Sequence, residues 1–168
     1  EVTLFDLPTA YALLGQSGQA MSHAELLLAA FIKHGKAAFE RISGAFSLVI
    51  WHEGALWLVR DPAGMRTLFY ARVGERWLVS DSLYDLRRWP ALPPRLDYRG
   101  MAAFLTFAYI PGADILLAGY RELLPGQVYR ITNEVVQSEQ IGTPGEPTQD
   151  ENKSDENKPI EAYASDLR

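Results

Sequence analysis

The alternation of apolar and polar residues predicts one long helix and four strands in the first half of the chain. Ser22, followed by Glu25 three positions later, has the spacing of a capping box ahead of an apolar run, and Gly35 suits a helix end. We therefore predict a helix over residues 23–34, deeply packed because it is apolar all round. Apolar runs bounded by short turns predict strands at residues 45–51, 55–61, 67–73 and 76–81. The short connections favour an antiparallel meander.

The remaining pattern predicts two more helices and a closing hairpin. A short helix is expected over residues 82–88, and a longer one begins after Asp97 and ends at Pro111-Gly112. The Pro125-Gly126 turn leads into a strand whose hairpin partner lies at residues 134–137. The first two strands are apolar on both faces, which predicts cover on both sides by other layers. The fold class is therefore α+β, in one globular domain over residues 1–137.

The charge is concentrated at the C-terminal end of the chain. Residues 1–137 hold thirteen basic and thirteen acidic residues, whereas residues 138–168 hold three and eight, which accounts for the net charge of −5. Because residues 138–159 are polar and proline-rich, we predict an acidic flexible linker there. Residues 160–168 are able to start a helix and suggest a further domain; a solvated tail without a partner is the alternative.

Composition also narrows the function classes. The body has no basic stripe for a phosphate backbone, so we expect no nucleic-acid partner. The apolar runs are too short to span a membrane, so we expect no membrane contact and a cytoplasmic location. The 168 residues include no cysteine, which excludes a thiol nucleophile within this chain. The three histidines have no spacing typical of a metal site, so we predict none.

The polar turn after the second strand is the clearest local motif. Residues 61–64, Asp-Pro-Ala-Gly, have the chemistry of a type I turn, with Gly64 at its fourth position. Arg60 closes an apolar strand, so it must either reach water or pair with a carboxylate, Asp61 or Asp81 being candidates.

Five pieces together resemble the glutamine amidotransferase domain at the front of asparagine synthetases. They are HAELLLAAFIKHG, FERISGAFSLVIWHEGALWLVRDPAGMRTLFY, WLVSDSLYDL, LDYRGMAAFL and LLPGQVYRI. The resemblance implies an N-terminal-nucleophile hydrolase fold, a layered αββα sandwich of antiparallel sheets, incomplete here at the N-terminus. It also implies that Arg60, Asp61, Gly64 and Arg66, with the strand end Ser80-Asp81, serve a turn or a domain interface. Residues 160–168 are similar to the start of the family's synthetase domain, missing here.

The chain departs from this family at the catalytic positions. The family uses an N-terminal cysteine as nucleophile, but residue 1 is Glu1 and Thr3 is internal, so we predict no catalytic residue. The family's substrate-binding aspartate is matched by Ser22-His23, which makes His23 the candidate substrate position. An ordinary solvent-exposed residue at a helix start is the favoured alternative for His23.

Two function classes follow from the resemblance. In the first, this is the inactive amidotransferase-like half of an ATP-dependent amide-forming synthetase, as in β-lactam synthetases or lasso-peptide cyclases. Its partners would be a C-terminal synthetase domain and a peptide substrate, with ATP and Mg only in that missing domain. A fragment of a true glutamine-hydrolysing asparagine synthetase, with its cysteine upstream, is a variant of this class. The second class is a non-catalytic, peptide-binding scaffold.

Overall fold

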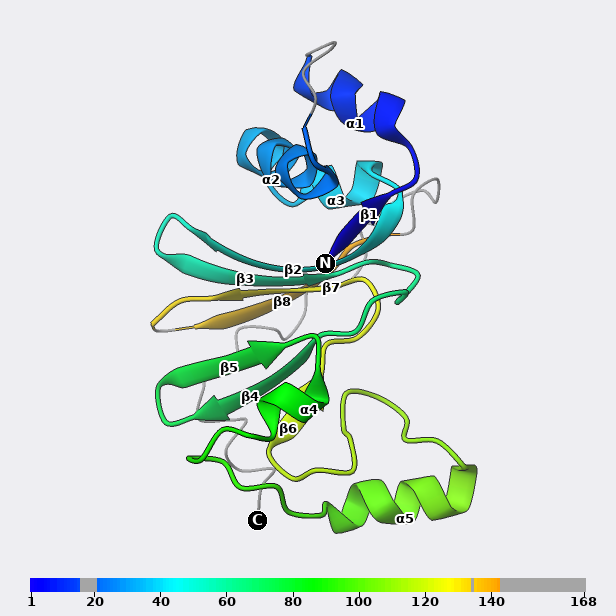
Figure 1. The fold of residues 1–168 in the computed structure, drawn as a ribbon, viewed down its shortest axis with the longest axis vertical. Coiled ribbons are helices and arrows are strands. Elements are labelled where there is room, and N and C mark those ends of the chain that lie inside the picture. Colours follow the sequence, from blue (N-terminus) through cyan, green and yellow to red (C-terminus); the bar gives the residue numbers. More distant parts are fainter. Residues whose placement is uncertain (16–20, 134, 143–168) are drawn as a thin grey trace. The chain divides into compact units, whose positions relative to one another are not determined.

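The computed structural model describes residues 1–15, 21–133 and 135–142. These residues form two compact units, which are described separately below (Figure 1). The first comprises residues 1–65 together with the chain from residue 125 onward, and the second comprises residues 66–124. After the second unit, the chain re-enters the first unit at residue 125 and completes it.

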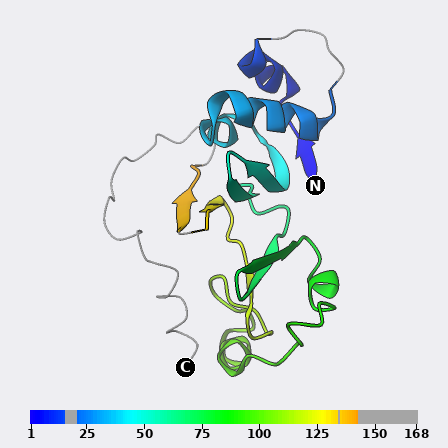
Figure 2. The same ribbon diagram turned by 90° about the vertical axis from the view of Figure 1, so that its left-hand side faces the viewer.

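The first unit is a five-stranded antiparallel sheet with three helices on one face. The strand order is β1-β2-β3-β7-β8. Figures 1 and 2 show the helices together on one side of the sheet. The strands are β1 Val2–Leu4, β2 Gly44–His52, β3 Ala55–Arg60, β7 Gln127–Ile131 and β8 Val136–Gln140, and the helices are α1 Leu7–Leu14, α2 His23–His34 and α3 Ala37–Arg41.

The core of the first unit lies between these helices and the sheet. Phe31 of α2 stacks on Phe39 of α3 with ring centroids 5.4 Å apart, and it meets the edge of Trp57 on β3 at 5.2 Å. Phe46 on β2 is fully buried beneath them. Aromatic contacts of this kind add to the apolar area that each ring buries. The aromatic cluster therefore fixes how the helical layer rests on the sheet.

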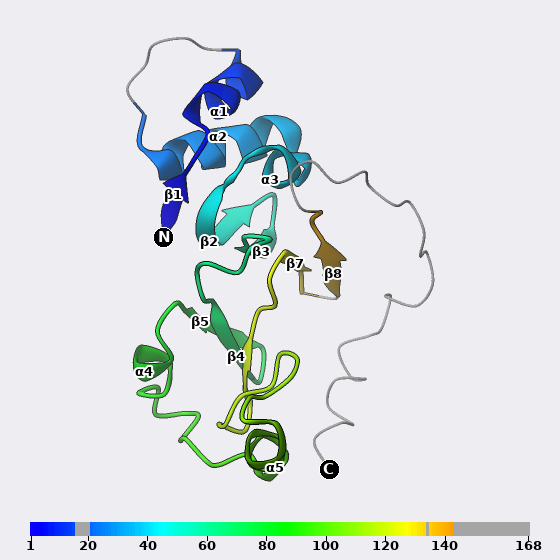
Figure 3. The same cartoon turned by 90° about the vertical axis from the view of Figure 1, so that its right-hand side faces the viewer.

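The second unit is built on a three-stranded antiparallel sheet of order β5-β4-β6. Its core groups Ala71, Leu86 and Tyr120. Figure 3 shows α4 beside the sheet and α5 at the far end of the unit. The strands are β4 Phe69–Val73, β5 Arg76–Ser80 and β6 Tyr120–Glu122, and the helices are α4 Leu83–Leu86 and α5 Tyr98–Phe107.

Most predicted elements are confirmed, but their pairing is not the predicted meander. Helices α2, α4 and α5, the four central strands and the closing hairpin all form, although α5 ends at Phe107 before the predicted end at Pro111-Gly112 and β8 begins at Val136. The α+β class with antiparallel sheets is confirmed. However, β3 pairs with β7 and β4 pairs with β6, so consecutive strands β3 and β4 belong to different sheets. The four-stranded meander was wrong because local turns do not specify partners that come from distant parts of the chain.

Two predictions of burial were also wrong. Helix α2 is not packed all round, since Leu28 and Ile32 are 42% and 59% exposed. The second half of β2 is not covered on both faces, because Val49 and Trp51 are exposed on either side of buried Ile50. Apolar residues on a surface are common, and an apolar sequence alone does not bury a face.

The predicted linker begins too early at residue 138. Ser138 pairs with Tyr129 inside strand β8, and Ile141 is 2% exposed within the core of the first unit. Pairing with β7 orders this polar stretch, because the strand partner supplies hydrogen bonds that its composition does not reveal. The predicted linker from residue 143 onward and the segment at residues 160–168 lie outside the described residues. Strands β1 and β6 and helices α1 and α3 were not predicted.

Candidate functional site

Asp61 is the centre of the motif that the sequence singled out. It follows β3 directly and its side chain is fully buried. One carboxylate oxygen, Oδ2, accepts a hydrogen bond from the backbone N–H of Phe46 at 3.3 Å, and the other, Oδ1, accepts from the N–H of Met65 at 3.0 Å. A buried carboxylate is tolerated where donors of this kind surround it. Asp61 therefore holds strand β2 and the polar turn together from inside.

The predicted turn is confirmed, and Arg60 supports it. The N–H of Gly64 donates to the carbonyl of Asp61 at 3.0 Å, which closes the turn. Arg60 is only 6% exposed, so the alternative that it ends in water is wrong. Its Nη2 donates to the carbonyl of Gly64 at 3.1 Å. The side chains of Arg60 and Asp61 therefore both hydrogen-bond to the backbone at the C-terminal end of the turn, Arg60 at Gly64 and Asp61 at Met65.

A second motif, distant in sequence, meets the first at Asp61. The N–H of Gly126, from the Leu-Pro-Gly turn, donates to the carbonyl of Asp61 at 3.0 Å. The ring of Pro125 lies against Gly64, where a Cβ would stand 2.7 Å from Pro125 Cγ. The N–H of Ile141 in turn donates to the carbonyl of Gly126 at 2.7 Å. Two of the five recognised motifs therefore form one structural junction in the first unit.

The other predicted turn residues lie in the second unit. Ser80 ends β5, and its hydroxyl accepts from the N–H of Ser82 at 3.0 Å. Asp81 is exposed, and its backbone carbonyl accepts a hydrogen bond from the hydroxyl of Thr67 at 3.1 Å. Arg66 is half-buried at the start of the unit. These contacts fasten the end of β5 to the chain entering β4.

His23 is tied to β1 by a hydrogen bond at the start of α2. Its Nδ1 accepts a hydrogen bond from the backbone N–H of Leu4 at 3.1 Å, and the residue is half-buried. The favoured alternative of a solvent-exposed residue is therefore wrong. The capping box is confirmed: Glu25 Oε2 accepts from the N–H of Ser22 at 2.8 Å, and Ser22 Oγ accepts from the N–H of Glu25 at 3.3 Å. The hydroxyl of Ser22 also donates to Glu25 Oε2 at 2.7 Å, and this bond, followed by the one from the N–H of Ser22, lowers the pKa of Glu25.

Helix α1 carries signals that the sequence analysis missed. Asp6 caps it by accepting from the N–H and the hydroxyl of Thr9 at 3.1 and 2.6 Å, and the hydroxyl bond is the main cause that lowers the pKa of Asp6. Asp6 followed by a proline at the helix start is a recognisable signal. At the other end, Lys33 donates to the carbonyls of Leu13 and Leu14 at 3.2 and 2.9 Å. Lys33 lies on the next helix, 19 and 20 positions further along the chain, so no local sequence pattern signals this contact.

The chemistry available to these residues is limited. Within residues 1–15, 21–133 and 135–142, no group of three His, Asp or Glu side chains could hold a metal ion. None of the helices in the described part of the chain is long and apolar enough to cross a bilayer. Arg60 and Asp61 bond to backbone groups of the polar turn and the residue after it, and Asp61 also accepts from Phe46 on β2. These bonds join the polar turn to strand β2.

A comparison with known families decides what this arrangement is. A family profile described as a glutamine amidotransferase domain matches residues 5–141. The chain belongs to this family. The match begins after β1 and ends at Ile141, so the amidotransferase domain includes β8 and the whole junction around Asp61.

Curated relatives of this glutamine amidotransferase domain are much longer proteins. The chain is 24% identical over 115 residues to asparagine synthetase [glutamine-hydrolyzing] 3 of Bacillus subtilis (strain 168), covering 66% of this chain and 19% of the relative. It is 24% identical over 112 residues to asparagine synthetase [glutamine-hydrolyzing] 1 of the same organism, covering 66% of this chain and 18% of the relative. The chain therefore spans about a fifth of the length of these relatives.

A solved structure supports the same fold. The glutamine phosphoribosylpyrophosphate amidotransferase of B. subtilis, complexed with ADP and GMP, matches with a TM-score of 0.54 and 21% identity, covering 84% of this chain and 28% of that one. Such a likeness concerns the fold alone. The predicted N-terminal-nucleophile hydrolase type of fold is thereby confirmed for the amidotransferase domain.

Proposed function

We propose that this domain is the amidotransferase-like half of an ATP-dependent amide-forming synthetase related to the asparagine synthetases, and that it has no glutaminase activity of its own. The observation that carries the proposal is the absence of cysteine from a chain that keeps the family fold. Without a thiolate there is no attacking atom of the kind that hydrolyses the glutamine side chain. The domain then serves the synthetase half as a scaffold, as in β-lactam synthetases or lasso-peptide cyclases.

The environment of His23 supports this proposal. His23 stands where the resemblance places the aspartate that binds the substrate's ammonium group. Its Nδ1 accepts a hydrogen bond from the backbone N–H of Leu4, so this nitrogen is engaged by strand β1. An imidazole held in this way supplies no fixed negative charge for an ammonium group.

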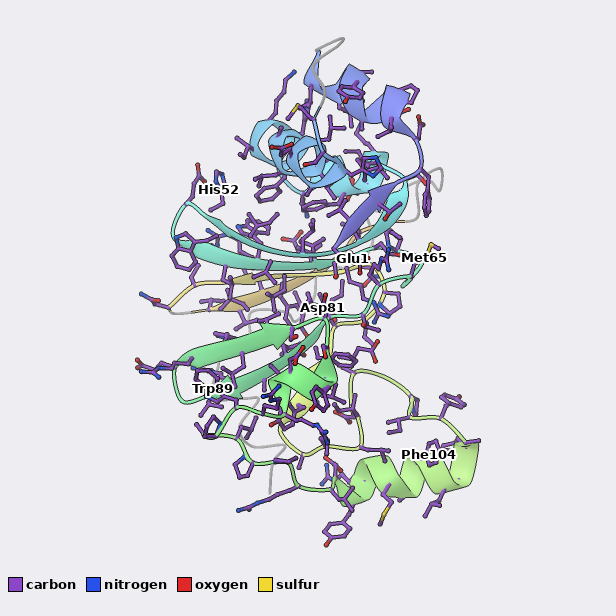
Figure 4. The ribbon with its side chains drawn as sticks, viewed as in Figure 1. Glu1, His52, Met65, Asp81, Trp89 and Phe104 are labelled. Carbon is purple, nitrogen blue, oxygen red and sulfur yellow. The ribbon has the colours of Figure 1, made fainter. Side chains whose placement is uncertain are left out.

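The proposal assigns the remaining partners to the second domain. ATP and Mg are expected there, since a nucleotide needs a charged phosphate site that the residues around Asp61 do not form. At the polar turn, Asp61 and Arg60 are buried, whereas the side chain of Met65 is 59% exposed (Figure 4). We therefore place contact with the synthetase half at Met65 and not at the buried pair. A cytoplasmic location is part of the same proposal.

Ammonia release from glutamine tests the loss of activity. We expect the purified chain to release ammonia at a rate indistinguishable from buffer, and a diazoketone analogue of glutamine to leave its mass unchanged. The B. subtilis asparagine synthetases, named as glutamine-hydrolysing, provide the positive control. Ammonia release by this cysteine-free chain, or a covalent adduct on any of its side chains, would contradict the proposal.

The names of the curated relatives favour a second candidate, a fragment of a glutamine-hydrolysing asparagine synthetase whose cysteine is encoded upstream. Sequencing the gene on both sides of this segment separates the two. A cysteine directly after the initiator methionine predicts a glutamine-dependent full-length enzyme. If that cysteine is absent and the full-length protein releases pyrophosphate from ATP without glutamine, the result supports the first proposal, an amidotransferase-like half without glutaminase activity. A stop codon directly after Arg168 would instead favour the non-catalytic scaffold.

A further inference from the structure

Helix α5 carries an apolar stripe on the side away from its docked face. Gly100 is the buried residue of the helix, and a Cβ there would stand 2.6 Å from the carbonyl oxygen of Ile115, so this side lies against the second unit's own chain (Figure 3). The helical period turns four apolar residues away from that contact, at the i, i+3, i+4 and i+7 positions of one face. These residues, which we call the α5 stripe, are Tyr98, Met101, Ala102 and Leu105.

The α5 stripe and the aromatic side chains beside it expose enough area for a contact. Tyr98 and Leu105, at the two ends of the stripe, are each 77% exposed. Phe104, Phe107 and Tyr109 are 46%, 57% and 62% exposed (Figure 4). Because an aromatic side chain presents about 150–250 Å², the four aromatic residues together leave about 500 Å² open. Exposed apolar patches of this size mark interaction sites, and the area suits a weak rather than a permanent interface.

The order of residues in the α5 stripe is self-complementary. If two α5 helices lie antiparallel about a two-fold axis between Met101 and Ala102, Tyr98 of each copy opposes Leu105 of the other. The large residues then pack at both ends of the contact, and the small Ala102 at its centre lets the helix axes approach closely. Such a contact uses the same surface on both copies, which is the commonest arrangement in protein dimers.

The charges of α5 favour the antiparallel direction. Arg99 is exposed in the first turn, at the positive end of its own helix dipole, and the last turn contains no basic residue. In the antiparallel pair, Arg99 lies opposite Phe104 of the second copy, beside the carbonyls at the negative end of that helix. A parallel pair would instead bring the two Arg99 side chains together. Charge therefore selects the same pairing that the stripe favours.

We propose that two copies of this chain associate through their α5 stripes as an antiparallel helix pair. Each copy supplies the apolar anchors Tyr98 and Leu105 and places Arg99 at the C-terminal end of the partner helix. The contact lies within the second unit of each copy, so it does not depend on how the two units of one chain are arranged. It also does not depend on the proposed function.

Sedimentation of the purified chain tests the association. Between about 1 µM and about 1 mM, we expect the mass to rise from one copy towards two. Leu105→Glu places a carboxylate in both ends of the apolar contact, so it should raise the dissociation constant at least about tenfold. Arg99→Glu should raise it about fivefold, because it puts a negative charge beside each helix C-terminus. Ile32→Glu is the matched control: Ile32 is 59% exposed on α2 of the first unit, and its replacement should leave the constant unchanged.

Disulfide formation tests the direction of the pair, since the chain has no cysteine of its own. With oxidised glutathione, Ala102→Cys should cross-link to its own copy, because this position lies next to the two-fold axis. Tyr98→Cys should not, because the two positions would be about 10 Å apart along the helices, beyond the reach of a disulfide. A mixture of the Tyr98→Cys and Leu105→Cys variants should give the mixed disulfide.

Three outcomes would overturn the proposal. A chain that stays a single copy up to about 1 mM would leave the α5 stripe to a different partner, such as the synthetase half. Association that Leu105→Glu does not weaken would place the contact elsewhere on the chain. A disulfide between two Tyr98→Cys copies would show a parallel pair. None of these results bears on ammonia release, so the proposed function is tested separately.

Discussion

Two constraints coincide at Gly64. Its φ of +65° lies in the left-handed region, and its missing side chain leaves room for the ring of Pro125. An alanine here would strain the backbone by about 1–2 kcal/mol and would also press its Cβ against a rigid ring. We expect Gly64→Ala to lower the free energy of unfolding in urea by about 2–4 kcal/mol.

Gly54 provides the control for the Gly64 substitution. It lies in the turn between β2 and β3 of the same unit, with a φ of +72°, and nothing stands within 4 Å of a Cβ built there. Gly54→Ala therefore carries the backbone cost without the collision. Equal losses for the two variants would mean that the contact between the Asp61 turn and Pro125 contributes nothing.

At the scale of elements, what could be predicted from sequence follows the range of the interactions involved. The capping box at Ser22, the cap at Asp97 and the turn at residues 61–64 depend on neighbours within four positions, and all three form as predicted. The pairing of β3 with β7 and the bond from Gly126 to Asp61 join residues some 65 positions apart or more. No local pattern carries that information, so the meander was wrong and the junction was missed.

In the candidate site, too, the local turn could be predicted from sequence, whereas the long-range contacts could not. The residue types at Arg60, Asp61 and Gly64 identified a turn, because aspartate and glycine have specific places in one. What the carboxylate binds could not be predicted, since its donors at Phe46 and Met65 are set by the fold. The partner of His23 likewise comes from β1, an element with too few residues to leave a clear pattern.

The helix caps of the first unit predict a loss of stability in acid. Bonds to Ser22 lower the pKa of Glu25 below its ordinary value of 4.5, and bonds to Thr9 lower the pKa of Asp6 below 3.8. The folded state thus binds these protons more weakly than the unfolded state, so the added stability is present above the ordinary values and lost as pH falls through the lowered ones.

Urea unfolding at neutral pH and at a pH below 3.8 measures this loss. Glu25→Gln can keep the capping bonds but has no carboxyl group to titrate, so it should lose less stability in acid than the unmodified chain. Asp6→Asn should act in the same direction, and the double variant should lose least. If all four proteins lose stability in parallel, the caps do not contribute to the acid response.

At the scale of the whole molecule, the two units carry titratable groups that respond to opposite ends of the pH range. The acid-sensitive caps of Asp6 and Glu25 both belong to the first unit. In the second unit, the hydroxyl of buried Tyr120 donates to the carbonyl of Leu92, and burial raises the pKa of Tyr120 above 10.0. The second unit should therefore be sensitive to alkali.

The direction of the change in stability with pH follows from the raised pKa of the Tyr120 hydroxyl. Because its pKa is higher in the folded state, the folded state binds this proton more tightly than the unfolded state does. The resulting stability is fully present below pH 10.0 and is lost as pH rises through the raised value. Tyr120→Phe lacks this proton, so it should lose stability at neutral pH by about 1 kcal/mol, as expected for one hydrogen bond, but lose less than the unmodified chain in alkali.

The four tryptophans allow each unit to be followed separately, because Trp51 and Trp57 lie in the first unit and Trp77 and Trp89 in the second. Replacing the first pair by phenylalanine makes fluorescence report on the second unit, and the converse double replacement reports on the first. We expect Tyr120→Phe to change the alkaline urea midpoint of the second-unit reporter while leaving that of the first-unit reporter in place. Equal shifts in both reporters would mean that the two units unfold as one, and that a change in one core is transmitted to the other.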